Sequence, residues 1–244
     1  MEIYVGMEFT NKKGFRWRVK EIIDMRNIVV ESFEWMPYTT IIRKSGVVKG
    51  IVMYPYGKQQ FGQYRGEGKW DASARNKHFR QWNAIFSRCY KSNSTNMPAY
   101  ADCIVGEDWM NLQVFCDWNE ANYPKDTHGY KWEIDKDLLG KGSKIYSSST
   151  CCYLPKEMNL FLARMNDVGI YKHIGLTGIP SYRVWVRQGK EIDSKQNHYV
   201  GSYSAYEEAY EVWKAKKKER HTALCKKYKD ILPEHVYRAF SALM

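Results

Sequence analysis

The sequence predicts an α+β protein, and three observations favour that class. Short runs of β-branched and aromatic residues, separated by turn sequences, fill the first 70 residues, a pattern typical of small antiparallel sheets. The middle of the chain mixes amphipathic helical patterns with short strands. The last third opens with an alternating strand and continues into a helix. We therefore expect three modules, at residues 1–70, 71–176 and 177–244.

The first module is predicted to be a small antiparallel sheet or barrel. Its apolar runs lie at residues 6–9, 17–22 and 28–33, and residues 11–14 form a good tight-turn sequence. A connector rich in glycine and aromatic residues follows, and its composition favours an ordered, packed segment over a free linker.

The charge of the chain favours polyanions as partners. There are 38 Lys and Arg residues against 27 Asp and Glu residues, for a net charge of +11 and a pI near 9.2. The net charge is +5 over residues 1–70, +1 over residues 71–176 and +5 over residues 177–244. In the middle module the carboxylates gather around Asp126, Glu133, Asp135 and Asp137. This pattern suits a protein that grips phosphates at its ends and holds a cation between them, although ordinary surface scatter is the alternative.

Other features indicate a soluble protein of a reducing compartment. The sequence has no run of eighteen apolar residues and no apolar signal segment at its start. Its six cysteines form no Cys-x-x-Cys pair, so we expect reduced, packed thiols and no structural zinc.

Two helices and a short strand are predicted to open the middle module. Phe79, Trp82 and Phe86 recur at helical spacing, residues 103–105 suggest a strand, and residues 109–118 suggest a second amphipathic helix. These aromatic residues are interpreted as core.

A hairpin around Asp135 is predicted next, followed by a helix that carries Asn159. The hairpin loop at residues 140–144 is glycine-rich and presents Lys141 and Lys144. Asp and Asn supply hard oxygen ligands suited to Mg²⁺ or Mn²⁺, with water and phosphate filling the other positions. Spacing alone does not separate a site from a coincidence.

Residues 79–165 resemble the HNH-type endonuclease domain of bacteriophage proteins, commonly found as free-standing proteins like homing endonucleases. The resemblance rests on the Arg-Cys-Tyr run after Trp82, on the segment from Pro98 to Trp109, and on Ile-Asp-Lys-Asp followed by Gly-x-x-Ile-Tyr-Ser, Cys, Pro and Asn. It implies a ββα-metal fold in which Asp135 and Asn159 hold a divalent Mg or Mn ion. In related nucleases a His that takes a proton from water follows the Asp, and here that position is Lys136.

The sequence leaves the general base open. Lysine has a reference pKa near ~10.4, and an acidic neighbourhood raises it further. Lys136 is therefore interpreted as a phosphate contact or transition-state clamp. His128, in an upstream Thr-His-Gly turn, is an alternative base, and a metal-bound hydroxide that needs no protein base is another.

The last module carries a predicted DNA-contact strand. Residues 182–187 alternate, which places Arg183, Trp185 and Arg187 on one face. A turn containing Lys190, a second short strand and a third at residues 198–203 are expected to complete a three-stranded sheet, and a helix then covers its apolar face. The helix is rich in basic residues, including Lys214, Lys217 and Lys218. They either add phosphate contacts or form a solvated face.

Residues 178–219 resemble the ethylene-response-factor DNA-binding domain of plants. Tyr-Arg-Val-Trp-Val, Gly-Lys, Gly-Ser-Tyr and Glu-Glu-Ala occur in that order. The resemblance implies that Arg183, Trp185 and Arg187 contact the major groove; an alternating surface strand with incidental cations is the alternative.

Together these features predict a phage-type protein that binds double-stranded DNA in the cytoplasm of an infected bacterial cell. The expected activity is that of a metal-dependent DNA endonuclease or nickase. The alternative is a catalytically degenerate DNA-binding regulator or host-takeover factor that keeps the HNH fold as a scaffold. A further alternative is an effector whose basic surface meets an acidic host protein. No membrane partner is expected.

Overall fold

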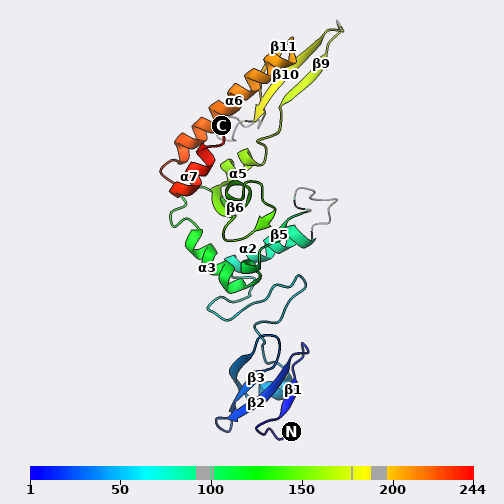
Figure 1. Cartoon of the computed structure of the whole chain (residues 1–244), viewed down its shortest axis with the longest axis vertical. Helices are drawn as coiled ribbons and strands as arrows, with labels where there is room; N and C mark the ends of the chain where they lie inside the picture. Colours follow the sequence, from blue (N-terminus) through cyan, green and yellow to red (C-terminus); the bar gives the residue numbers. More distant parts are fainter. Residues whose placement is uncertain (92–99, 101, 177, 188–196) are drawn as a thin grey trace. The chain divides into compact units, whose positions relative to one another are not determined.

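The computed structural model describes residues 1–91, 100, 102–176, 178–187 and 197–244 (Figure 1). The structure contains helices and several small β-sheets, so the α+β class is confirmed. The chain forms two compact units, Met1–Ala121 and Asn122–Met244.

An antiparallel four-stranded sheet, in the order β1-β2-β3-β4, opens the first unit. Trp17, Val19, Ile28 and Val30 are fully buried on one face of it, as the period-two pattern of their strands requires. The sequence identified the first three strands and missed β4 and the short helix α1. The bounds are β1 Glu8–Thr10, β2 Arg16–Ile22, β3 Asn27–Ser32, β4 Tyr38–Arg43 and α1 Lys44–Lys49.

Two amphipathic helices, together with shorter elements, follow the sheet in this unit. Trp82 and Trp109 are buried, and the Trp82 indole Nε1 donates to the Trp109 carbonyl at 2.7 Å. Both predicted helices are present, and the first continues into a π-helical turn. The bounds are α2 Lys77–Phe86, the π-helix η1 Ser87–Lys91, β5 Ile104–Val105, the 3₁₀-helix η3 Glu107–Met110 and α3 Leu112–Asn122.

The second unit begins with a strand, a loop, a second strand and a helix. Strands β6 and β8 pair antiparallel, and α5 starts directly after β8, as the hairpin-and-helix prediction requires. The loop between them also contains the short elements α4 and β7. The bounds are β6 Trp132–Asp135, α4 Asp137–Gly140, β7 Ile145–Tyr146, β8 Cys152–Pro155 and α5 Lys156–Leu162.

A three-stranded antiparallel sheet packed on a long helix follows, also as predicted. Its order is β11-β10-β9, with β9 Ile170–Ile174, β10 Pro180–Arg187 and β11 Asn197–Tyr203. The helices are α6 Tyr206–Tyr228 and α7 Glu234–Ser241.

The third strand of this sheet is not the one that the sequence suggested. It is β9, which lies ahead of β10 and before the predicted module boundary at residue 177. The short strand expected just after residue 190 lies outside the described residues. Residues 170–174 form only a five-residue run, and their place in the sheet comes from pairing with β10.

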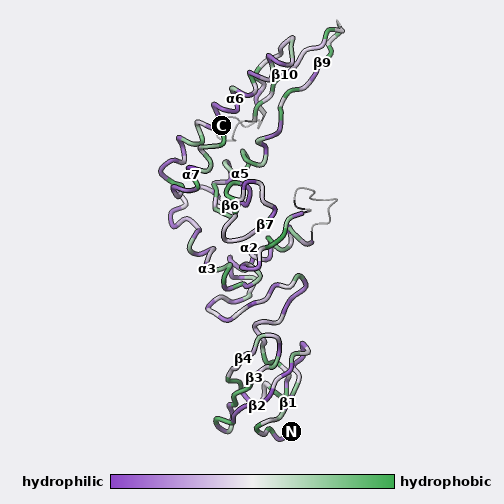
Figure 2. Tube along the Cα trace, in the orientation of Figure 1, coloured by the Kyte–Doolittle hydropathy of each residue, from purple (hydrophilic) through white to green (hydrophobic). Residues whose placement is uncertain are grey.

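Helix α6 carries its buried residues on one side. Figure 2 shows hydrophilic residues along much of α6, whose buried residues form a single stripe: Ala209, Trp213, His221, Leu224 and Tyr228. Within the described part of the chain, no helix combines the length and apolarity needed to cross a membrane.

Candidate functional site

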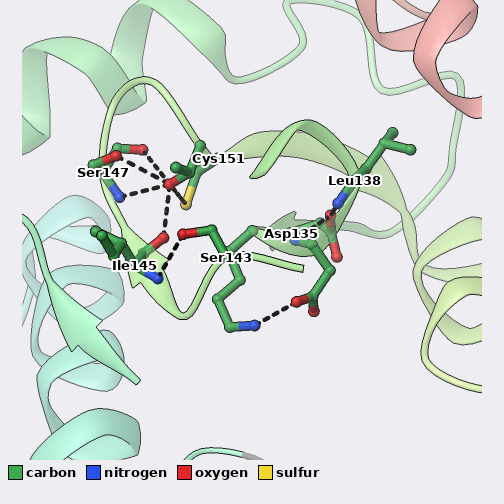
Figure 3. Close-up of polar contacts among 9 residues, drawn as sticks. Asp135, Leu138, Ser143, Ile145, Ser147 and Cys151 are labelled. Carbon is green, nitrogen blue, oxygen red and sulfur yellow. Dashed lines mark hydrogen bonds and ion pairs between the residues drawn. The ribbon is translucent and has the colours of Figure 1, made fainter. Parts of the chain in front are cut away.

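Asp135 is the last residue of β6 and is held in a buried position. Its side chain is 4% exposed, and its Oδ2 accepts hydrogen bonds from the backbone N–H groups of Asp137 at 3.0 Å and Leu138 at 2.8 Å (Figure 3). Asp135 therefore caps the first turn of α4. Burial raises the pKa of this carboxyl to about 6, against the lowering effect of the Leu138 and Asp137 N–H groups.

Lys136 is also buried, and its ammonium is already occupied. Its side chain is 5% exposed, and Nζ lies 2.5 Å from Asp137 Oδ1. The same Nζ lies 5.9 Å from the centre of the Tyr146 ring, within the range of a cation–π contact. Asp137 therefore pairs with the ammonium, and the Tyr146 ring contacts it. This arrangement disfavours Lys136 as a general base, and its role as a phosphate contact would require it to leave both partners.

Asn159 lies in α5 and faces Glu133 of β6. The Asn159 Nδ2 donates to Glu133 Oε2 at 2.9 Å. Glu133 precedes Asp135 by two residues on the same strand, the spacing at which strand side chains point to one face. The structure thus joins Asn159 to Glu133, and the hydrogen bonds described for Asn159 do not include Asp135. In the sequence Glu133 was only a member of an acidic cluster; its i, i+2 spacing from Asp135 was the signal available.

The donor atoms fit a hard divalent cation better than zinc. Asp135 uses Oδ2 to cap α4, which leaves Oδ1 for a cation, while Glu133 keeps Oε1 and Asn159 keeps its one side-chain oxygen, Oδ1. Mg²⁺ commonly binds through one or two carboxylates together with water and phosphate. In the described part of the chain, no three or more His, Cys, Asp and Glu side chains gather as a metal-binding group. A metal site formed by Asp135, Glu133 and Asn159 would use oxygen ligands.

The alternative base, His128, lies in a turn of its own. Its backbone has a φ of 48°, its N–H donates to Asp126 Oδ1 at 2.7 Å, and its Nδ1 lies 3.5 Å from Asp126 Oδ2. The ring is about half exposed and lines a pocket of about 400 Å³ together with Cys151, Cys152 and His235. The contacts described for His128 are with Asp126, and they include neither Asp135 nor Lys136.

The outer face of the three-stranded sheet carries the predicted contact residues. Val184 is fully buried, whereas Arg183 is exposed and Trp185 is 36% exposed, so the predicted alternation of β10 is confirmed for these residues. The pairing register places Tyr171 and Ser202 beside Arg183, and Tyr199 beside Trp185.

Aromatic rings extend this outer face. The Trp185 and Tyr199 rings lie 5.2 Å apart, centre to centre, and Tyr171 and Tyr199 are exposed. The result is a surface with a guanidinium among three aromatic rings. The sequence identified Arg183 and Trp185 and missed the two tyrosines, because only strand pairing places them there.

The predicted basic residues of α6 do not share this face. The helix covers the inner side of the sheet, where Val184, Ala209 and Trp213 pack together. Lys214 and Lys218 are exposed on the helix layer, away from the outer face of the sheet. A DNA duplex whose groove lies on the outer face of the sheet would not reach Lys214 and Lys218.

The Lys217 ammonium is hydrogen-bonded to backbone carbonyls of the protein. Its Nζ donates to the backbone carbonyls of Arg164 at 2.6 Å and Met165 at 2.5 Å, with Asp167 at 3.4 Å. These contacts argue against a phosphate-binding role for Lys217.

Four predicted DNA contacts remain, namely Lys141, Lys144, Arg187 and Lys190. Lys141 and Lys144 are exposed in the hairpin loop, and Lys141 has a φ of 49° at the end of α4. Arg187 ends β10, but its side chain is outside the described part of the structure, as is Lys190 altogether. No protein-family model matches the chain, and neither does any curated protein or solved structure.

Proposed function

We propose that this protein binds double-stranded DNA through the outer face of β9, β10 and β11. The observation that carries the proposal is the exposed guanidinium of Arg183 beside Trp185 on a sheet whose other face is buried against α6. A two-stranded or three-stranded β surface fits the width of the major groove. Arg183 offers a fork for guanine edges or phosphates, and the rings of Trp185 and Tyr199 offer apolar contact to bases.

Electrostatics and sequence both support this assignment. The net charge of +11 favours association with a polyanion, and the chain resembles phage HNH-type proteins and the ethylene-response-factor domain. Positive charge alone would give binding without sequence preference. The outer face is proposed as the part that reads sequence.

Substitution on the outer face tests the proposal. Arg183→Ala and Trp185→Ala are expected to weaken binding to a selected duplex by roughly 10-fold to 100-fold, since a good base contact is worth about 1–3 kcal/mol. Lys214→Ala is the matched control, because it removes one exposed positive charge from the helix layer and should have a much smaller effect. Equal losses for Arg183→Ala and Lys214→Ala, measured by fluorescence anisotropy, would place the contact surface elsewhere.

A second candidate function is metal-dependent DNA cleavage at the β6–β8–α5 hairpin. The observation that favours it is the pairing of Asn159 with Glu133, next to Asp135 on the same strand face. A bound Mg²⁺ or Mn²⁺ would supply Lewis-acid activation of the phosphate and a nucleophilic water. Asp135 and Asn159 would hold the ion, and Glu133, which accepts the hydrogen bond of Asn159 Nδ2, would either add a ligand or accept the proton of the attacking water in place of the missing His.

Cleavage is tested directly on supercoiled DNA with Mg²⁺ or Mn²⁺. We expect nicked or linear product from the parent chain and none from Asp135→Ala or Asn159→Ala. Glu133→Gln separates the roles of Glu133, since an amide keeps an oxygen ligand but cannot accept the proton. Binding without cutting under every metal would favour the degenerate regulator or host-takeover factor instead.

A further inference from the structure

Helix α6 connects the sheet to the hairpin module within the second unit. Its first half packs under the sheet, where Ala209 and Trp213 meet Val184. Its second half meets α5, with the rings of His221 and Phe161 centred 5.8 Å apart. Figure 1 shows this course, from β10 and β11 to α5 and α7. The helix contains neither Gly nor Pro over its 23 residues, so it has no sequence feature that favours a kink.

Helix α5 is fastened to α6 at its first turn. Glu157 Oε2 lies 3.0 Å from Lys227 Nζ and accepts a hydrogen bond from the Tyr228 hydroxyl at 3.2 Å. Glu157 precedes the candidate metal ligand Asn159 by only two residues. The contact therefore fixes the helix that carries Asn159.

Lys217 fastens the other end of α5. It donates to the carbonyls of Arg164 and Met165, which follow the last turn of α5. Cations are stabilised near the C-terminal ends of helices, where backbone carbonyls lack partners within the helix. The first turn of α5 contacts the end of α6, and the segment after α5 contacts the middle of α6. The two helices therefore pack antiparallel.

Lys217 also touches the core of the sheet module. Its Nζ lies 4.7 Å from the centre of the Trp213 ring, and burial lowers the pKa of this lysine. The turn that Lys217 holds leads in seven residues from α5 to β9. The Lys217 side chain therefore contacts two parts of the unit. One is Trp213, which packs under the sheet, and the other is the segment that joins α5 to β9.

We propose that Lys217 and Glu157 are positioning residues that hold the DNA-reading face and the hairpin at one fixed spacing. The inference rests on the proposed binding of DNA by the sheet, but it does not require cleavage. Any contact or cut that the hairpin makes would then fall at a constant distance from the recognised sequence.

The length of α6 sets the scale of that distance. The fifteen steps from Trp213 to Tyr228 span about 22 Å at the helical rise of about 1.5 Å per residue. This is about 6 base pairs of B-DNA at roughly 3.4 Å per step. We expect the hairpin to lie within one helical turn of the recognised bases.

Affinity cleavage tests the spacing without relying on the protein's own activity. The full chain, with Cys225→Ser and Lys144→Cys, carries an iron chelate in the exposed hairpin loop and binds a duplex selected from a random pool. Hydroxyl-radical cuts are mapped against the footprint of the sheet. In the parent background we expect cuts confined to a window of a few base pairs at one offset.

The variants separate positioning from charge. Lys217→Met should broaden the cut window at least twofold, whereas Lys218→Met removes the same charge from an exposed neighbour and should leave it unchanged. Glu157→Gln keeps an acceptor for Tyr228 but loses the ion pair, and it should broaden the window even if Lys217→Met does not fold. Circular dichroism verifies the fold of each variant.

The outcomes distinguish the two claims. Absence of any sequence-selective footprint would overturn the proposed DNA binding and this inference with it. A clear footprint with diffuse cuts in the parent would overturn the fixed spacing alone. Identical windows in the parent, Lys217→Met and Glu157→Gln would show that these residues do not position the hairpin.

Discussion

At the residue scale, the candidate metal site contains a buried acidic and a buried basic side chain. Asp135 and Lys136 are adjacent in the chain and are 4% and 5% exposed. Asp135 is satisfied by backbone N–H groups, and Lys136 by Asp137 and Tyr146. Buried charges are costly unless they are paired and hydrogen-bonded. Lys136 is therefore part of the local structure.

The raised pKa of Asp135 gives a prediction for stability. Its folded pKa of about 6 lies above the ordinary value of 3.8, so between these values the folded state binds more protons than the unfolded state. The free energy of unfolding should therefore fall as pH rises from about 4 to about 6. Asp135→Asn keeps an acceptor for the α4 cap and removes this titration. It should stabilise the metal-free protein by up to about 3 kcal/mol at pH 7, since each pKa unit is worth about 1.4 kcal/mol.

Urea denaturation in the presence of a chelator, repeated from pH 4 to pH 8, measures the effect. Asp126→Asn is the control, because that carboxylate is exposed, and it should follow the pH profile of the parent. A parallel profile for Asp135→Asn and the parent would contradict the prediction.

At the element scale, the sheet depends on a close approach between β10 and the segment before β9. The Trp185 N–H donates to the Gly169 carbonyl at 2.7 Å. A Cβ on Gly169 would lie 2.0 Å from the Trp185 carbonyl oxygen, which is far inside contact distance. Glycine at this position lets the chain leave the hairpin module and enter the sheet.

Gly169→Ala is therefore expected to destabilise the protein. The clash involves backbone on both sides, so relief requires a strand shift, and overpacking of this kind costs about 1–3 kcal/mol. Gly175→Ala is the matched control, since a Cβ there meets nothing within 4 Å. Chemical denaturation of both variants checks the difference, and equal midpoints would show that the segment moves freely.

At the scale of the whole molecule, positive charge is spread over several surfaces. Arg183 lies on the outer sheet face, Lys214 and Lys218 on the helix layer, and Lys141 and Lys144 on the hairpin loop. Only the first set lies with Trp185. We expect the lysines of the helix layer and of the hairpin loop to contact phosphates. Their substitution should therefore change affinity more than sequence preference.

Salt dependence tests this division of roles. A protein that neutralises six or more phosphates loses about 1,000-fold or more in affinity between 50 and 200 mM salt. We expect such a loss for this chain, and a shallower slope of log affinity against log salt for Lys141→Ala with Lys144→Ala. Titrations at four salt concentrations measure both slopes. A weak dependence for the parent would exclude extensive phosphate contact.

Local periodicity explains most of what the sequence predicted correctly. The alternation of residues 182–186, the helical spacing in α2 and α3, and the strand-loop-strand-helix order around Asp135 depend on neighbours a few residues apart. Those patterns fix which side chains face a core. They do not state which element covers them.

Amino-acid order by itself determined the α+β class, the positions of most strands and helices, and the exposed placement of Arg183 and Trp185. Only the tertiary structure decided that Asn159 meets Glu133, 26 residues away, and that Lys217 caps carbonyls more than 50 residues away. It also placed β9 in the sheet and buried Lys136 beside Tyr146. Contacts over such separations depend on how whole elements pack, and no periodicity within a single segment encodes that packing.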